Sequence, residues 1–202
     1  MSDILCVTSR ALCKEDFLVR VERVAAARPL GIILREKDLS EGTYRALAGQ
    51  VFEICERYGT ACILHGFPAA AAEIGCRAIH LPLPALRALS ESEKEAFLVL
   101  GASCHSVAEA QEAERLGCTY VTAGHVFETE CKKGLPGRGL AFLREICGCL
   151  SIPVYAIGGI CPKRMAFVRQ AGAAGACVMS GGMTCEDVPG YFSAFKERED
   201  DI

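Results

Sequence analysis

The sequence predicts a single α/β domain, residues 1–202, with the fold of a (βα)8 barrel (TIM barrel) and an active site at the C-terminal ends of its strands. Two observations support this prediction. Short β-prone runs alternate with helical patterns along the whole chain. No linker or shift in composition divides the 202 residues, and their number suits one domain. An open, doubly wound sheet is the competing fold, but no GxGxxG motif follows the first expected strand.

Eight short β-prone runs predict eight strands. In order, they are Ile4–Thr8, Gly31–Arg35, Ala61–His65, Ala78–Leu81, Phe97–Cys104, Tyr120–Phe127, Pro153–Gly158 and Ala176–Ser180. Between these runs, apolar residues recur every three or four positions, as a helix with one buried face requires. The segments Ser106–Leu116 and Pro162–Ala171 have this pattern. Each strand is therefore expected to lead into a helix.

Capping residues mark several helix ends. Ser106 is expected to cap the N-terminus of its helix, with Glu109 completing a capping box. Pro162 suits a first helical turn. Gly117 and Gly172 suit the C-terminal caps of the two helices. These boundaries are the best defined in the sequence.

Composition excludes several classes of protein. Hydrophobic residues make up 51% of the chain and charged residues 23%, which predicts a folded core. The net charge of −3, without a basic block, argues against a nucleic-acid partner. The 13 cysteines lack paired CxxC motifs and are expected to be reduced thiols of the core. Because neither a signal-peptide pattern nor an 18-residue apolar run is present, we expect a soluble cytoplasmic protein with no membrane partner.

Four histidines occur in or just after consecutive expected strands, the third to the sixth. They are His65, His80, His105 and His125. For His80, a hydrogen-bonded place in the core is the simpler interpretation. His125 ends a strand of small apolar residues, where an imidazole is available for acid–base chemistry. A metal site is not favoured, because no carboxylate with ligand spacing accompanies the histidines.

Two features indicate an anionic ligand. Alternation along the second expected strand directs Arg35 toward the barrel axis, although the segment Arg35–Asp38 also suits a solvated loop. Glycine pairs follow the seventh and eighth strands, at Gly158–Gly159 and Gly181–Gly182. They can serve tight turns, but in a barrel this is where bare main-chain N–H groups bind a phosphate. We therefore expect a phosphate monoester as the ligand.

The longest polar connection, Glu128–Gly139, directly follows the strand of His125. It contains several glycines and the cations Lys132 and Lys133. An ordinary solvated loop is one interpretation. A mobile lid that covers an anion is the other, because flexible glycines adjoin a candidate catalytic residue.

Five segments together resemble the thiamine phosphate synthase superfamily in order and spacing along almost the whole chain. They read LREKD, GASCHSVAEAQEAERLGCTYV, GHVFETECKKGLPGRGL, SIPVYAIGGI and AGAAGACVMSG. The stretch GHVFETECKKG is most similar to the thiazole tautomerase branch. The superfamily fold is a (βα)8 barrel, in agreement with the prediction from strand and helix patterns.

The resemblance to the tautomerase branch implies an isomerase that aromatises a carboxythiazole ethyl phosphate by proton transfer. It implies His125 as the catalytic residue and requires neither metal nor cofactor. The implied phosphate-binding residues are Gly158, Gly159, Ser180 and Gly181. The implied contacts to the rest of the substrate are Arg35, Lys37, Ser103, Thr129, Lys132 and Lys133. The partner is then a small-molecule thiazole phosphate, and a homo-oligomer is left open.

The alternative is a thiamine phosphate synthase, a transferase that couples a pyrimidine pyrophosphate with a thiazole phosphate and uses Mg²⁺ held by acidic residues. The chain departs from the synthase pattern at two acidic positions. An Asn-Asp pair is replaced by His65-Gly66, and the position of the aspartate expected after the fourth strand falls in the apolar stretch Leu81–Ala85. A glutamine is replaced by Ile33 and a threonine by Cys131, although Lys37 is synthase-like. These departures predict the loss of synthase activity. A non-catalytic regulator that binds a thiamine precursor is a third hypothesis.

Overall fold

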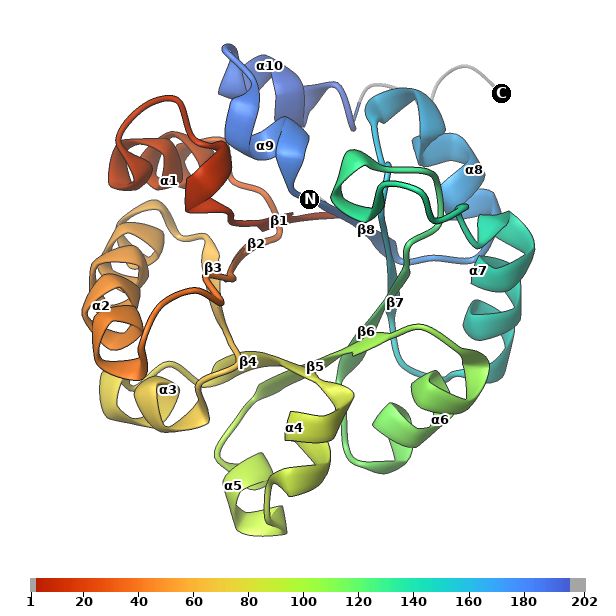
Figure 1. Ribbon diagram of the computed structural model, residues 1–202, viewed down its shortest axis with the longest axis horizontal. Helices are drawn as coiled ribbons and strands as arrows, with labels where there is room; N and C mark the ends of the chain where they lie inside the picture. Colours follow the sequence, from red (N-terminus) through yellow and green to blue (C-terminus); the bar gives the residue numbers. More distant parts are fainter. Residues whose placement is uncertain (1–2, 197–202) are drawn as a thin grey trace. The chain divides into compact units, whose positions relative to one another are not determined.

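The computed structural model describes residues 3–196. Eight strands form a closed barrel in the order of the sequence, with helices between them (Figure 1). They are β1 (Ile4–Val7), β2 (Gly31–Leu34), β3 (Ala61–His65), β4 (Ala78–Pro82), β5 (Val99–Cys104), β6 (Tyr120–Gly124), β7 (Val154–Ile157) and β8 (Gly175–Val178). The predicted (βα)8 barrel is confirmed.

Helices follow the strands along the chain. The α-helices are α1 (Phe17–Ala26), α2 (Glu41–Tyr58), α3 (Pro68–Ile74), α4 (Leu83–Ala88), α5 (Glu91–Glu95), α6 (Val107–Arg115), α7 (Gly139–Cys149), α8 (Met165–Gln170), α9 (Ser180–Thr184) and α10 (Val188–Ser193). Short 3-10 helices are η1 (Arg10–Leu12), η2 (Glu130–Lys132) and η3 (Pro162–Arg164). Within residues 3–196, no helix is long and apolar enough to cross a membrane.

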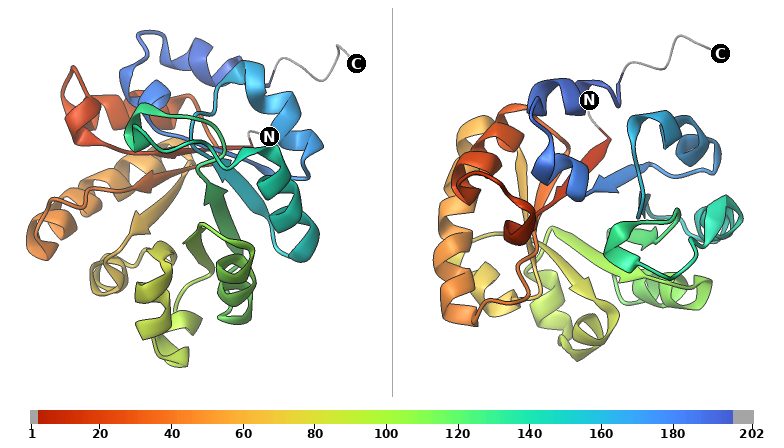
Figure 2. Two further views of the ribbon diagram at one scale, coloured as in Figure 1. Left: turned by 45° about the vertical axis from the view of Figure 1, so that its right-hand side comes forward. Right: turned by 45° about the horizontal axis from the view of Figure 1, so that its top comes forward.

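The described residues divide into two compact units. Unit 1 contains residues 3–79 and 179–196, and unit 2 contains residues 80–178. In unit 1, α1 packs against α2, and α2 covers β2 and β3. In unit 2, α6, α7 and α8 pack side by side along strands β5 to β8 (Figures 1 and 2). Every residue of β1, β2, β6 and β8 is buried, as expected for parallel strands that are covered on both faces.

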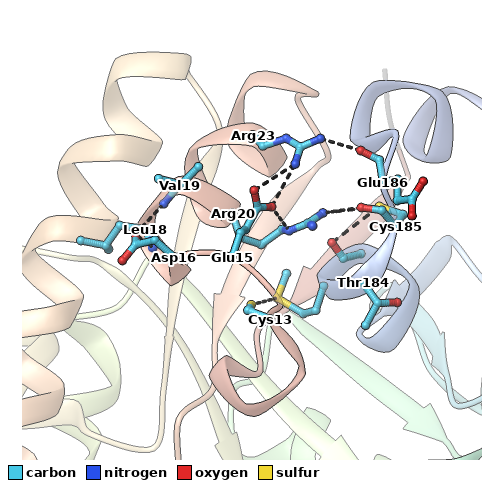
Figure 3. Close-up of polar contacts among 12 residues, drawn as sticks. Cys13, Glu15, Asp16, Leu18, Val19, Arg20, Arg23, Thr184, Cys185 and Glu186 are labelled. Carbon is cyan, nitrogen blue, oxygen red and sulfur yellow. Dashed lines mark hydrogen bonds and ion pairs between the residues drawn. The ribbon is translucent and has the colours of Figure 1, made fainter.

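A buried cation connects α1 to the end of α9 within unit 1. Arg20 is 4% exposed, and its Nε lies 2.6 Å from the Glu15 carboxylate. Its Nη1 donates to the Cys185 carbonyl at 2.7 Å. Figure 3 shows Arg23 reaching in the same way from α1 to Glu15 and to the Glu186 carbonyl. These contacts tie the chain that follows α9 to the first helix.

Most differences from the predicted strands are of one to three residues at their ends. The largest concerns β6, which stops at Gly124 and not at Phe127. The ladder ends there because Val126, and not His125, donates to the Ile157 carbonyl at 2.8 Å. This change of partner takes His125 out of the strand and places it at the start of the following loop.

The predicted cap of α6 is confirmed, but its capping box is wrong. The Ser106 side chain accepts from the Glu109 N–H at 3.1 Å. The Glu109 carboxylate, however, accepts from the main-chain N–H of His105 at 2.6 Å, one residue before the cap. A reciprocal capping box forms instead at the start of α5, between Ser90 and Glu93.

The other predicted helix boundaries are confirmed. Pro162 is the first residue of η3. Gly117 and Gly172 lie just after α6 and α8 with φ of +89° and +92°, a conformation that glycine adopts without a steric penalty. All 13 cysteines are free, and seven of them are buried, whereas Cys131 is exposed. The expectation of core thiols therefore holds for the buried ones.

The Arg20 cluster leads to a stability prediction. Glu15→Gln should lower the free energy of unfolding by about 2 kcal/mol, because it leaves a buried guanidinium without its counter-charge. Urea denaturation at pH 7 measures this change. Glu22→Gln is the matched control, since its exposed pair with Arg57 should contribute less than about 1 kcal/mol. Equal losses in the two variants would contradict the assignment.

Candidate active site

The predicted site residues are distributed over both units. Arg35, Lys37, Ser180 and Gly181 belong to unit 1. Unit 2 contains the others, which are Ser103, His125, Thr129, Lys132, Lys133, Gly158 and Gly159. Each unit therefore has its own group of polar residues in or just after its strands.

In unit 1, the segment after β2 contains a buried carboxylate, Glu36, with a cation on each side of it in the sequence. Glu36 is 5% exposed and accepts a hydrogen bond of 2.7 Å from the Thr8 hydroxyl. It also accepts from the main-chain N–H of Arg10 at 3.1 Å. These bonds hold the carboxylate against the loop that follows β1. Arg35 is half-buried and Lys37 exposed on either side of it.

A buried tyrosine holds the ends of β2 and β3 together. The Tyr44 hydroxyl donates to the Leu34 carbonyl at 2.7 Å and accepts from the main-chain N–H of His65 at 2.8 Å. Tyr44 is 0% exposed, and burial raises the pKa of its hydroxyl far above the usual range. The phenol therefore stays neutral and keeps the proton that it donates to Leu34.

His65 lies at the end of β3 beside the two cations of the β2 loop. It is 6% exposed, and its pKa is lowered to about 4, first by burial and then by the positive charges of Arg35 and Lys37. The imidazole is thus neutral at pH 7. Two cations next to a neutral base form a surrounding that suits an anionic ligand.

The ends of β3 and β4 do not fit a magnesium site. Mg²⁺ prefers carboxylate oxygens, but β3 ends in His65 followed by Gly66, and β4 ends in Pro82 followed by Leu83. Within residues 3–196, no group of three or more His, Cys, Asp or Glu residues is arranged to hold a metal ion.

In unit 2, Ser103 on β5 is bonded to His80 on β4. The Ser103 Oγ lies 2.8 Å from the His80 Nε2, and the His80 Nδ1 lies 2.9 Å from the Tyr120 hydroxyl on β6. His80 is 3% exposed, so its interpretation as a hydrogen-bonded core histidine is confirmed. Ser103 is half-buried at the outer end of this chain of bonds.

In unit 2, His105 and His125 each bond to a main-chain carbonyl. The exposed His105 donates from Nδ1 to the Gly124 carbonyl at 2.9 Å. His125 is half-buried, and its Nε2 donates to the Leu135 carbonyl at 3.3 Å. The imidazole of His125 therefore contacts the loop between β6 and α7.

The glycine pair after β7 packs closely against the residues after β6. A Cβ on Gly158 would lie 2.3 Å from the Cβ of His125, and a Cβ on Gly159 would lie 2.5 Å from the Glu128 carbonyl oxygen. Their carbonyls accept from Phe127 N–H (3.1 Å) and from the Arg164 guanidinium (2.5 Å). Within the described chain, the N–H groups of Gly158 and Gly159 have no protein acceptor. Only glycines fit at these two positions, because the residues after β6 occupy the space of a side chain. A tight turn alone would not require this close contact.

The glycine that follows β8 has a different neighbour. Ser180 is exposed and begins α9, and its carbonyl accepts from the Thr184 hydroxyl at 2.9 Å. A Cβ on Gly181 would lie 2.1 Å from the Tyr191 hydroxyl oxygen of α10. Gly181 is therefore needed for the packing of α9 on α10 within unit 1.

The loop between β6 and α7 forms a cavity of about 510 Å³. Its lining includes Thr129, Lys132 and Lys133, so the structure brings these three predicted residues together. The two lysines are exposed and belong to or follow the short helix η2. Two cations and a hydroxyl suit a phosphate group, although the carboxylates of Glu128 and Glu130 line the same cavity.

Sequence reasoning missed three residues that shape these groups. Tyr44 on α2 and Tyr120 on β6 are buried tyrosines whose hydrogen-bond partners lie on strands elsewhere in the chain. Arg164 binds the Gly159 carbonyl and stacks 4.6 Å over the Phe127 ring. No local motif marks any of them, because their partners lie on other elements of the fold.

The lowered pKa of His65 predicts a stability change with pH. Unfolding restores the ordinary pKa of about 6.5, so the unfolded chain binds a proton that the folded chain does not. Stability from this group is complete above pH 6.5 and decreases by about 3 kcal/mol as the pH falls to 4. His65→Gln should weaken this dependence in urea denaturation, whereas His105→Gln should not. An NMR titration with a pKa of 6.5 or more for His65 would refute it.

Three comparisons with known proteins agree. A family model described as thiamine monophosphate synthase matches residues 4–181. The chain is 31% identical to "Thiamine-phosphate synthase 2" of Streptococcus pneumoniae, over 91% of this chain and 88% of the relative. It is 31% identical to a thiamine-phosphate synthase of Desulfitobacterium hafniense, over 90% and 89%. A solved thiamine phosphate pyrophosphorylase of Pyrococcus furiosus matches with a TM-score of 0.82 and 26% identity, covering 96% of this chain and 93% of that one.

These findings correct one expectation and confirm another. The relatives are named as synthases, which are transferases, so the expectation of a thiazole tautomerase, an isomerase, is wrong. The segment around His125 supports the tautomerase prediction over a short stretch, whereas the similarity to the synthases extends over nine-tenths of the chain. The resemblance to the superfamily is confirmed. The chain belongs to the thiamine monophosphate synthase family.

Proposed function

We propose that the chain is a thiamine-phosphate synthase that couples a pyrimidine pyrophosphate with a thiazole phosphate. The observation that carries the proposal is 31% identity to named synthases over about nine-tenths of the chain. In the coupling, the thiazole nitrogen attacks the methylene carbon of the pyrimidine. The nitrogen lone pair forms the new N–C bond as the C–O bond breaks. The electron pair of the C–O bond leaves with pyrophosphate.

The cations after β2 suit the pyrophosphate group. Arg35 and Lys37 lie close enough to lower the pKa of His65, and the nearby Glu36 is already held by Thr8 and Arg10. Charge-assisted hydrogen bonds from these cations would stabilise the negative charge that the leaving group gains. Because the ends of β3 and β4 do not fit Mg²⁺, this proposal uses the chain's own cations and contains no step through a metal.

The glycine turn after β7 suits the thiazole phosphate. The N–H groups of Gly158 and Gly159 are donors without protein acceptors, and Thr129, Lys132 and Lys133 line the cavity of the adjoining loop. His125 contacts both the turn and the loop. We assign it to the wall of this phosphate site. For Ser180 and Gly181, which belong to unit 1, phosphate binding stays an expectation from the family resemblance.

The proposal is tested with the purified chain, both substrates, and Mg²⁺ present or replaced by a chelator. We expect thiamine phosphate and pyrophosphate in equal amounts. Arg35→Gln should lower kcat/KM for the pyrimidine pyrophosphate about 10- to 100-fold, because a charged hydrogen bond contributes about 1.5–3 kcal/mol. Arg45→Gln, which removes an exposed cation paired with Glu73, is the control and should change kcat/KM less than about twofold. Binding of both substrates without turnover would favour a regulator instead.

A second prediction concerns the turn after β7. Gly159→Ala should weaken binding of inorganic phosphate or thiazole phosphate at least tenfold, about 1.4 kcal/mol, because the added Cβ would push the turn away from Glu128. Isothermal titration calorimetry measures the affinity. Gly148→Ala in α7 is the control, since no atom lies within 4 Å of its added Cβ. Unchanged affinity in Gly159→Ala would remove this turn from the site.

A further inference from the structure

A chain of two hydrogen bonds runs from the core of unit 2 to the hydroxyl of Ser103. It crosses β6, β4 and β5 through Tyr120, His80 and Ser103, at 2.9 and 2.8 Å. Tyr120 and His80 are 5% and 3% exposed, whereas Ser103 is half-buried. Only the last member of the chain is thus open to a ligand.

A glycine makes this arrangement possible. Gly101 on β5 is the register partner of Tyr120 on β6. A Cβ on Gly101 would lie 2.2 Å from the Cζ of Tyr120 and 2.5 Å from its hydroxyl oxygen. The tyrosine ring therefore lies across β5 in space that any other residue would fill. This position brings its hydroxyl to the Nδ1 of His80.

The direction of both hydrogen bonds follows from the chemistry of the three groups. Burial raises the pKa of Tyr120 well above its ordinary value, so the phenol keeps its proton. Within the described residues, its hydrogen-bond partner is His80 Nδ1, and a buried donor without an acceptor would cost about 1–3 kcal/mol. Tyr120 thus donates to Nδ1, which leaves the ring proton on Nε2.

The direction of these bonds determines which hydrogen bonds Ser103 can make. With its proton on Nε2, His80 donates to the Ser103 oxygen. The Ser103 hydroxyl hydrogen is then free of this bond. The hydroxyl hydrogen is therefore available to a hydrogen-bond acceptor of a ligand, such as an anionic phosphoryl oxygen.

We propose that Tyr120 is a positioning residue, which acts through His80 to hold Ser103 as a hydrogen-bond donor toward an anionic oxygen of the substrate. The inference rests on the proposed function for the identity of that substrate. No proton is transferred along the chain, because each member only donates the hydrogen that it already carries. Since negative charge on the substrate's phosphoryl oxygens grows during the reaction, a fixed donor should affect kcat more than KM.

The direction of the bonds is tested without substrate. In the full chain with ¹⁵N-labelled histidine, NMR should show neutral His80 with its proton on Nε2, with the signal assigned from a His80→Gln variant. A proton on Nδ1 would overturn the proposal whatever the activity. If the proton is on Nε2 but the unaltered chain makes no thiamine phosphate, the relay is supported and the proposed function fails.

The action through Ser103 is tested by a double-mutant cycle. Tyr120→Phe should lower kcat about tenfold with less than about twofold change in KM. In a Ser103→Ala background, the same change should have no further effect. Tyr58→Phe, which removes a hydroxyl bound to Glu22 in unit 1, is the control and should leave kcat unchanged. An effect of Tyr120→Phe that persists without the Ser103 hydroxyl would show a merely structural role and refute the proposal.

Discussion

The close approach of neighbouring strands at glycines is the constraint on which unit 2 depends. Gly101 leaves room for the ring of Tyr120, and a Cβ on Gly124 would lie 2.5 Å from the Ile157 carbonyl oxygen. Gly158 packs in the same way against His125. At each of these positions, one strand or its continuation occupies the space of a missing side chain. The polar groups of the unit are therefore placed by close packing against these glycines, which leaves little room for movement.

Unit 1 positions its polar groups by buried hydrogen bonds. Tyr44 joins the ends of β2 and β3, and Thr8 bonds to both the Arg35 N–H and the Glu36 carboxylate. A buried group that loses its partner is costly, so each bond fixes a loop as well as a strand end. The same burial that stabilises this arrangement lowers the pKa of His65 and keeps it neutral beside two cations.

The sequence alone is sufficient for the strand order and for the helix ends that capping residues mark, because hydrophobic periodicity and capping are local. It placed the end of β6 three residues too far, since the partner of Val126 depends on the register with β7. The tautomerase prediction is wrong because the segment around His125 is short, whereas the similarity to the synthases extends over about nine-tenths of the chain. The bonds among Tyr120, His80 and Ser103 join three strands, and no single segment contains their pattern.

The two units offer an anion different kinds of interaction. Unit 1 presents full charges, Arg35 and Lys37, whose attraction acts over several ångströms and is screened by salt. The glycine turn in unit 2 offers dipolar donors, which act only at hydrogen-bond distance and require a defined geometry. The two cations therefore suit the pyrophosphate, whose negative charge increases as it leaves. Dipoles suit a phosphate that must stay in place, because their direction fixes the orientation of the bound molecule.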